Sequence, residues 1–164
     1  MKEIAAFIAI LYLISREKTP MGSATSAGSK YRGMRNNNPG NIRITSIPWI
    51  GKIPVSMNTD KQFEQFYKME DGIRAALVNM RTHYNRGKDT IRKMVTTWAP
   101  YSDNPAPAVD NYIQSVSNYA NLDPDEYFDF NKKNAVNIMY RIFRFENNGE
   151  GPAKGLISEQ FDRI

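Results

Sequence analysis

The feature that most constrains the fold is a series of apolar residues at helical spacing over residues 71–146. Apolar side chains recur there every three or four positions, in four runs separated by turn residues. Each run predicts an amphipathic helix with one buried face. The positions expected to face the core are Ile73, Leu77, Met80 and Tyr84; Ile91, Met94, Val95 and Trp98; Val109, Tyr112, Ile113 and Val116; and Ala135, Ile138, Met139, Ile142 and Phe143.

The helix boundaries are indicated by capping residues. Asp71 and Asp89 are predicted to cap the first two helices. The fourth helix is predicted to begin near Asn131 and to reach Glu146, and a short amphipathic piece over 156–164 follows it.

The segment before these helices has a different pattern. From residue 42 to 66, short apolar or aromatic runs such as "IRITSIPWIGKIPV" and "KQFEQFY" are interrupted by Pro48, Gly51 and Pro54. These runs predict a small, irregular antiparallel sheet or hairpin. The expected fold class is therefore α+β and mainly helical, with a small β-hairpin lobe near the start of the domain and a cleft between the lobes.

The first 30 residues differ in composition from the rest. An apolar run of eleven residues, 4–14, is shorter than the roughly 20 residues that span a bilayer and matches a signal-peptide core. It is interpreted as an anchoring or envelope-directing segment, cleaved or retained, with docking onto a protein partner as the alternative. A stretch rich in Gly, Ser, Ala and Thr follows and predicts a flexible linker, so one folded domain is expected over 31–164.

Positive charge is concentrated in the first third of the chain. Residues 15–52 hold seven Lys or Arg and one acid, a net +6, whereas residues 53–164 hold fourteen against fifteen, a net −1. Such a region favours an anionic polymer, an acidic membrane or a cell wall, or it is a solvated basic surface. Nucleic acid is not the expected partner, because no helix is predicted there to present a basic face.

Composition also limits the chemistry. The chain has no cysteine and one histidine, so thiolate and histidine-rich metal sites are excluded. His83 lies near the end of a predicted helix and is interpreted as a structural or solvated residue. With no glycine-rich phosphate loop, no cofactor is expected, and carboxylates are the most plausible acid-base groups.

Glu146 is the carboxylate with the most unusual setting. It ends a strongly apolar helix and directly follows the aromatic "IFRF". The negative end of the helix dipole and the loss of water both predict a raised pKa, as a general acid requires; a solvated acid beside a helix end is the alternative. Glycoside cleavage commonly uses a second carboxylate, for which Glu64 and Asp103 are candidates, whereas lytic transglycosylases need one acid.

An ordered set of motifs runs through residues 32–148. It comprises "RGMRNNNPGNIR" (32–43), "WIG" (49–51), Phe63 and Phe66, "GIRA" (72–75), Tyr84 with "GKDTI" (87–91), "WAP" (98–100) with Asn104, and "FENN" (145–148). The set resembles a family of phage virion-associated, peptidoglycan-degrading proteins of the lysozyme-like superfamily. Two positions depart from that family: Phe145 replaces a histidine, and "NGEGPA" replaces a shorter loop that contains a tyrosine.

The resemblance implies cleavage of the β-1,4 bond between N-acetylmuramic acid and N-acetylglucosamine, by which a phage breaches the host wall. A lytic transglycosylase is the favoured type, with Glu146 as general acid and then base. The asparagine-rich segment also resembles a hairpin of bacterial glucosaminidases, in which the catalytic glutamate precedes the hairpin. A glutamate late in this chain would then imply a circularly permuted order. The implied location is the virion, with action in the host periplasm. A non-catalytic structural virion protein, attached to virion membrane or coat proteins through residues 4–14, and a stem-peptide endopeptidase are the alternatives.

The resemblance also suggests ligands for a glycan. Asn36, Asn37, Asn38 and Asn41 either bind sugar hydroxyl and N-acetyl groups or satisfy the backbone of a tight loop. Arg35 and Arg43 either meet peptide-stem carboxylates or pair with acids of the core. Trp49 and Tyr101 are candidate sugar-stacking faces, and Trp98 is expected in the core. Pro39 and Gly40 predict a type II turn with a positive φ at Gly40.

Overall fold

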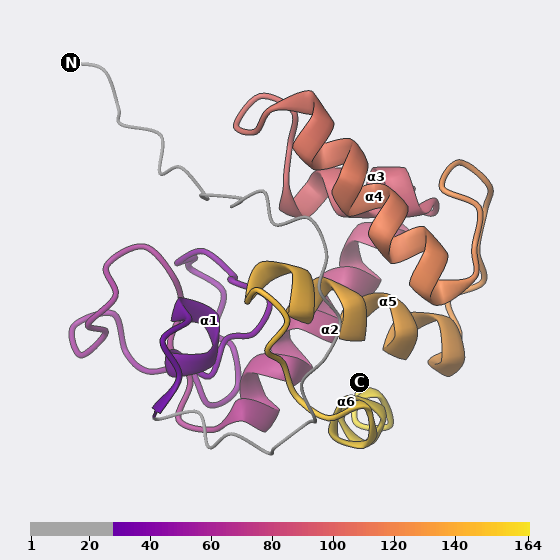
Figure 1. Cartoon of the computed structure of the whole chain (residues 1–164). Coiled ribbons are helices and arrows are strands. Elements are labelled where there is room, and N and C mark those ends of the chain that lie inside the picture. The colour runs from indigo at the N-terminus through magenta and orange to yellow at the C-terminus, as the bar shows by residue number, and fades with distance from the viewer. Residues whose placement is uncertain (1–27) are drawn as a thin grey trace.

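A computed structural model describes residues 28–164 of the chain (Figure 1). The predictions for the apolar run 4–14 and for most of the linker concern residues outside this range. The described part is mainly helical, and it contains no helix long and apolar enough to cross a membrane. Its helices are α1 (Arg32–Arg35), α2 (Met69–Asn85), α3 (Ile91–Trp98), α4 (Ala106–Ala120), α5 (Lys132–Glu146) and α6 (Lys154–Phe161).

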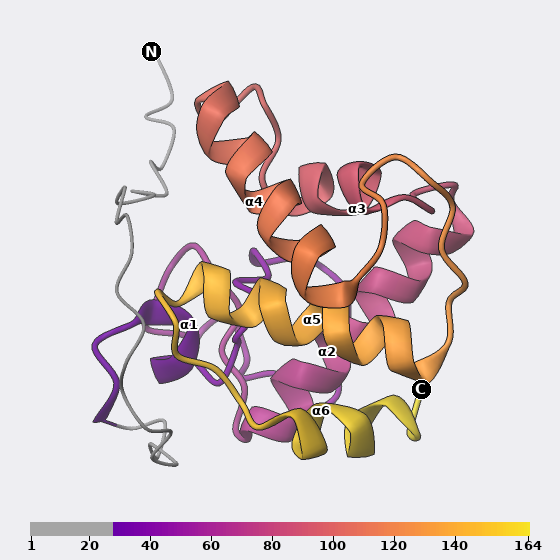
Figure 2. The same cartoon turned by 45° about the vertical axis from the view of Figure 1, so that its right-hand side comes forward.

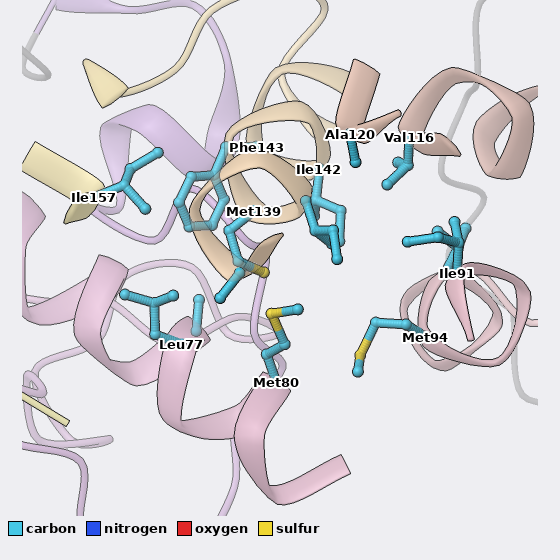
Figure 3. Packing of buried hydrophobic residues seen from close by; sticks show 14 of the residues in the cluster. Leu77, Met80, Ile91, Met94, Val116, Ala120, Met139, Ile142, Phe143 and Ile157 are labelled. Atoms are coloured by element: carbon cyan, nitrogen blue, oxygen red, sulfur yellow. The ribbon is translucent and has the colours of Figure 1, made fainter. Parts of the chain in front are cut away.

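The helices form one core around α5. This helix packs against α4 on one side and α6 on the other, and α6 in turn packs against α2 (Figure 2). Figure 3 shows Leu77 and Met80 of α2 directed toward Met139 and Phe143 of α5, with all four buried. The helical faces read from the sequence are confirmed, except that Tyr84 and Trp98 lie at the edge of the core and are partly buried.

Both predicted helix caps are wrong by one or more residues. α2 begins at Met69, so Asp71 lies in its first turn, where a negative charge still favours the helix dipole. Thr90 rather than Asp89 caps α3, because its Oγ1 accepts a hydrogen bond from the amide of Lys93. The predicted start of α5 near Asn131 is confirmed, and Asn131 caps the helix by accepting a hydrogen bond from the amide of Asn134.

The asparagine-rich stretch begins with a short helix that the sequence pattern did not indicate. α1 gives way to a loop in which Asn37 and Asn41, with φ of 50° and 48°, adopt the left-handed conformation. Asparagine tolerates this conformation better than other non-glycine residues. The prediction of a positive φ at Gly40 is therefore wrong, since the two asparagines on either side of the Pro39–Gly40 pair take that role.

Between α1 and α2 lies the loop region, defined here as residues 36–68. It is drawn from indigo to magenta beside α1 in Figure 1. The sequence predicted a small sheet, but this region contains only two isolated antiparallel bridges, Arg43 with Phe63 and Lys52 with Phe66. Pro48 and Pro54 lack the amide hydrogen that a continuous strand pairing needs, which explains the short pairings.

The loop region contacts α2 at a glycine. A Cβ atom at Gly72 would lie 1.8 Å from the carbonyl oxygen of Asn37. Glycine in a helix normally weakens it by about 0.5–1 kcal/mol relative to alanine. Here the missing side chain lets the loop backbone approach the helix. Close packing therefore explains the glycine of the "GIRA" motif.

We predict that Gly72→Ala lowers the free energy of unfolding by about 1–3 kcal/mol through this clash, although alanine favours helices. Gly155→Ala in α6 is the matched control, because nothing lies within 4 Å of its added Cβ, and it should be neutral or slightly stabilising. Chemical denaturation of both variants measures the difference. Equal stability of the two would contradict the close approach at Gly72.

Candidate active site

A pocket of about 320 Å³ lies where the loop region meets the helices. Its lining residues come from the loop region, from α2 and α3, and from the segment between α3 and α4. The last residue of α5, Glu146, also lines it. The complete lining is Gly40, Asn41, Ile42, Arg43, Thr45, Ile47, Trp49, Phe63, Asn79, His83, Thr97, Trp98, Pro100, Asp103, Asn104 and Glu146.

The carboxyl group of Glu146 accepts one hydrogen bond at each oxygen. Asn41 Nδ2 donates to Oε2 at 3.0 Å, and the Tyr112 hydroxyl donates to Oε1 at 3.0 Å. Burial raises the pKa of Glu146, while the bonds from Asn41 and Tyr112 oppose the rise because they favour the ionised form. The raised pKa predicted from the sequence is therefore supported, and burial is its main cause.

Tyr112 lies behind the carboxyl group and is almost fully buried. Burial, followed by the nearby Glu146 charge, raises the pKa of Tyr112 well above its ordinary value, so its hydroxyl remains a donor. The ring of Phe145 stacks on Tyr112 with centroids 3.9 Å apart and planes 8° apart. Phe145 thus covers Tyr112, the residue whose hydroxyl bonds to Glu146.

Two side chains fix the loop that carries Asn41. Asn147 Nδ2 donates to the Pro39 carbonyl at 2.9 Å, and Trp98 Nε1 donates to the Gly40 carbonyl at 3.0 Å. Asn147 is completely buried. Pro39 and Gly40, the two residues before Asn41, are therefore bonded to the ends of α5 and α3. These bonds hold the Asn41 side chain beside Glu146.

Asn37 and Asn38 have structural positions that differ from the expected glycan-binding role. Asn38 is fully buried, and its amide bonds the backbone of Ile42 and Glu64. Asn37 Nδ2 donates to the carbonyls of Phe66 and Tyr67. Neither residue lines the pocket, so both satisfy the loop backbone, which was the alternative for these amides.

The two candidate second carboxylates lie in different environments. Glu64 is fully buried and pairs with Lys52 at 2.7 Å while accepting a bond from the Thr45 amide. It lies outside the pocket lining, so a second catalytic role does not fit Glu64. Asp103 is exposed and lines the pocket from the segment between α3 and α4.

Of the remaining predicted glycan ligands, some line the pocket and one does not. Arg43 and Trp49 line the pocket, and Trp49 is partly buried with its indole N–H unpaired among the described residues. Tyr101 does not line it, because its hydroxyl turns toward Asp110, to which it donates at 2.7 Å. Of the predicted glycan ligands, Asn41, Arg43 and Trp49 therefore line the pocket, and the amide nitrogen of Asn41 is bonded to Glu146.

Sequence reasoning missed several pocket residues, of which His83 is the most notable. Burial first, and then the charges of Arg86 and Lys88, lower the pKa of His83. Its ring meets Trp98 edge-on, with centroids 6.3 Å apart. The motif "WAP" with the following Asn104 was the available signal for this wall, whereas nothing in the local pattern marks Asn79.

The arrangement offers acid-base chemistry from one side chain. Glu146 is an acid of raised pKa at a pocket, and two donors orient it. Within residues 28–164 no group of three or more His, Asp or Glu side chains is placed to hold a metal ion.

Comparison with known proteins gives a link to bacteriophages. No protein-family model matches this chain. Protein P5 of Pseudoalteromonas phage PM2 is 35% identical over 98 residues, which cover 57% of this chain and 58% of that protein. The chain therefore aligns with less than two thirds of the relative's length, and the similarity connects it to a phage protein whose name describes no activity.

We predict that Tyr112→Phe raises the pKa of Glu146 further, because it removes a hydrogen bond that favours the carboxylate. An NMR titration of the Glu146 side-chain carbon measures this pKa in both proteins. Tyr119→Phe, which removes a hydroxyl from the same helix at an exposed position, should leave the titration unchanged. A fall in the pKa after Tyr112→Phe would contradict the described hydrogen bond.

We also predict that Glu146→Gln stabilises the protein near neutral pH. Since its pKa is raised in the fold, the unfolded chain loses this proton first, and the free energy of unfolding falls as pH rises above the ordinary glutamate value. Tm of Glu146→Gln should exceed that of the wild type at about pH 7, and the difference should shrink toward about pH 4. Glu159→Gln, at an exposed position, is the control without this pattern.

Proposed function

We propose that this protein is a phage peptidoglycan-degrading enzyme that cleaves the β-1,4 bond between N-acetylmuramic acid and N-acetylglucosamine. The observation that carries the proposal is Glu146, an acid of raised pKa that lines the pocket and accepts bonds from Asn41 and Tyr112. A general acid must hold its proton near neutral pH and release it to a leaving oxygen. The similarity to a phage protein is compatible with a virion-associated enzyme that acts in the host periplasm.

The order of the elements supports a circularly permuted lysozyme-like fold. The loop region with the asparagine-rich motif precedes the helices, and Glu146 ends α5, 105 residues after Asn41 in the chain. In glucosaminidases the glutamate precedes the asparagine-rich segment in the chain, whereas Glu146 follows it. Both glutamates can nevertheless occupy the same position in space beside that segment. In this proposal, α5 replaces a helix that would otherwise come first.

The proposed reaction is a lytic transglycosylation in two steps. Glu146 first donates its proton to the glycosidic oxygen, while the substrate's N-acetyl group assists departure of the leaving sugar. The resulting carboxylate then accepts the proton of the 6-hydroxyl, which closes the 1,6-anhydro ring. The buried ion pair that removes Glu64 from the pocket favours this one-acid route.

Asp103 provides the competing route. It lines the same pocket from an exposed segment, and a carboxylate opposite the acid could activate water for an inverting hydrolysis. The two routes leave different chain ends: transglycosylation gives 1,6-anhydro-muramic ends, whereas hydrolysis gives reducing ends.

The test is digestion of purified sacculi by the full chain, with products identified by mass spectrometry. We expect wild type and the control Glu159→Gln to release fragments with 1,6-anhydro-muramic ends. Glu146→Gln should be slower by about 10²- to 10⁴-fold, the usual contribution of a general acid. Asp103→Asn should leave transglycosylation nearly intact.

Other results identify the alternatives. Equal activity of Glu146→Gln and wild type would remove Glu146 from the reaction. New reducing ends that depend on Asp103 would indicate a hydrolase, and new free amino groups would indicate an endopeptidase. An absence of products from wild type would favour a structural virion protein.

A further inference from the structure

Two arginines share the ring of Phe63 but differ in their ion pairing. The guanidinium carbons of Arg32 and Arg43 lie 5.0 Å and 5.5 Å from the ring centroid. Arg32 Nε pairs with Asp60 Oδ2 at 3.3 Å. Arg43 has no acidic partner within the described range 28–164, so its charge is uncompensated there.

The backbone around Arg43 is fixed. Arg43 and Phe63 form an antiparallel bridge, and the amides of Ile44 and Glu64 donate to the carbonyls of Gln62 and Ile42 at 3.0 Å and 2.9 Å. Phe63 itself is buried, so its ring is a rigid support for the guanidinium. The Arg43 side chain is exposed and lines the pocket, and an arginine without an ion-pair partner at a pocket suits recognition of a planar anion.

The charges of the pocket are arranged unequally. Arg43 lines the wall made by the loop region, whereas Asp103 lines the end made by the segment after α3. Lys52, also in the loop region, does not line the pocket and is paired with Glu64 at 2.7 Å. An anionic group on a ligand is therefore favoured beside Arg43 and disfavoured beside Asp103.

In a peptidoglycan strand, the carboxylates are carried by one of the two alternating sugars. N-acetylglucosamine is neutral, whereas N-acetylmuramic acid bears a lactyl arm that ends in a carboxyl group or continues into an acidic stem peptide. We propose that Arg43 binds a carboxylate on the arm of N-acetylmuramic acid and thereby selects peptidoglycan over neutral glycans. This inference rests on the proposal that the pocket binds peptidoglycan.

Three forms of the same glycan separate the sources of the carboxylate. Intact strands carry stem carboxylates, strands stripped by an amidase carry lactyl carboxylates, and stripped strands whose lactyl carboxyl groups are then amidated chemically are neutral. Binding is measured with full-length Glu146→Gln protein, which should not cut its ligand, and cleavage is measured separately with the active chain.

We predict that adding Arg43→Gln weakens binding to the carboxylate-bearing strands by about fivefold, as expected for one exposed ion pair. It should not change binding to amidated strands. Arg43→Lys should lose less affinity, because it keeps the charge but not the planar fork. Arg35→Gln is the matched control, since Arg35 is exposed in the same stretch but outside the pocket lining.

The outcomes separate the proposed role of Arg43 from the proposed cleavage of the glycan. If Arg43→Gln weakens binding to stripped strands, Arg43 binds the lactyl carboxylate. If it weakens binding to intact strands alone, Arg43 binds a carboxylate of the stem peptide. Equal weakening on charged and amidated strands, or none on either, would overturn the role of Arg43 while leaving the cleavage proposal standing. A chain that neither binds nor cuts any strand would overturn both.

Discussion

The hydrogen bond from the buried amide of Asn147 to the carbonyl oxygen of Pro39 joins segments 108 residues apart, and the pocket depends on it. Trp98 holds the next carbonyl, that of Gly40. The same contact explains Gly33, where a Cβ would lie 2.5 Å from Asn147 Oδ1. The motifs at the two ends of the domain are therefore parts of one structural unit, although neither alone indicates the other.

The helical half of the fold was predictable because its signal is local. The buried faces follow from the spacing of apolar residues, and the same spacing placed the start of α5 near Asn131. The loop region was predicted less well, since proline, glycine and short aromatic runs do not determine how three chain segments pair. Its two isolated bridges depend on contacts between residues more than ten positions apart, which no local period reports.

For the candidate site, the sequence indicated the acid, Glu146, but gave much less information about the residues around it. Aromatic neighbours and a helix end indicated a raised pKa for Glu146, and burial supports that direction. Tyr112 looked like a core residue by spacing, and it is buried, but its hydroxyl reaches the acid. Asn37 and Asn38 looked like ligands by residue type, yet their amides are committed to backbone groups. Residue type indicates which bonds a side chain can form, whereas only the fold decides its partner.

The position of Glu146 in the chain has a consequence during synthesis. A ribosome produces the loop region and α2 to α4 before the acid that completes the pocket at the end of α5. A domain generally folds as a unit, and the core of this one is built around α5, so a partly made chain that lacks α5 has neither the packed core nor the Glu146 carboxyl group of the pocket. Any activity that depends on Glu146 therefore requires that most of the domain has been translated, and a fragment cut before α5 lacks this carboxyl group altogether.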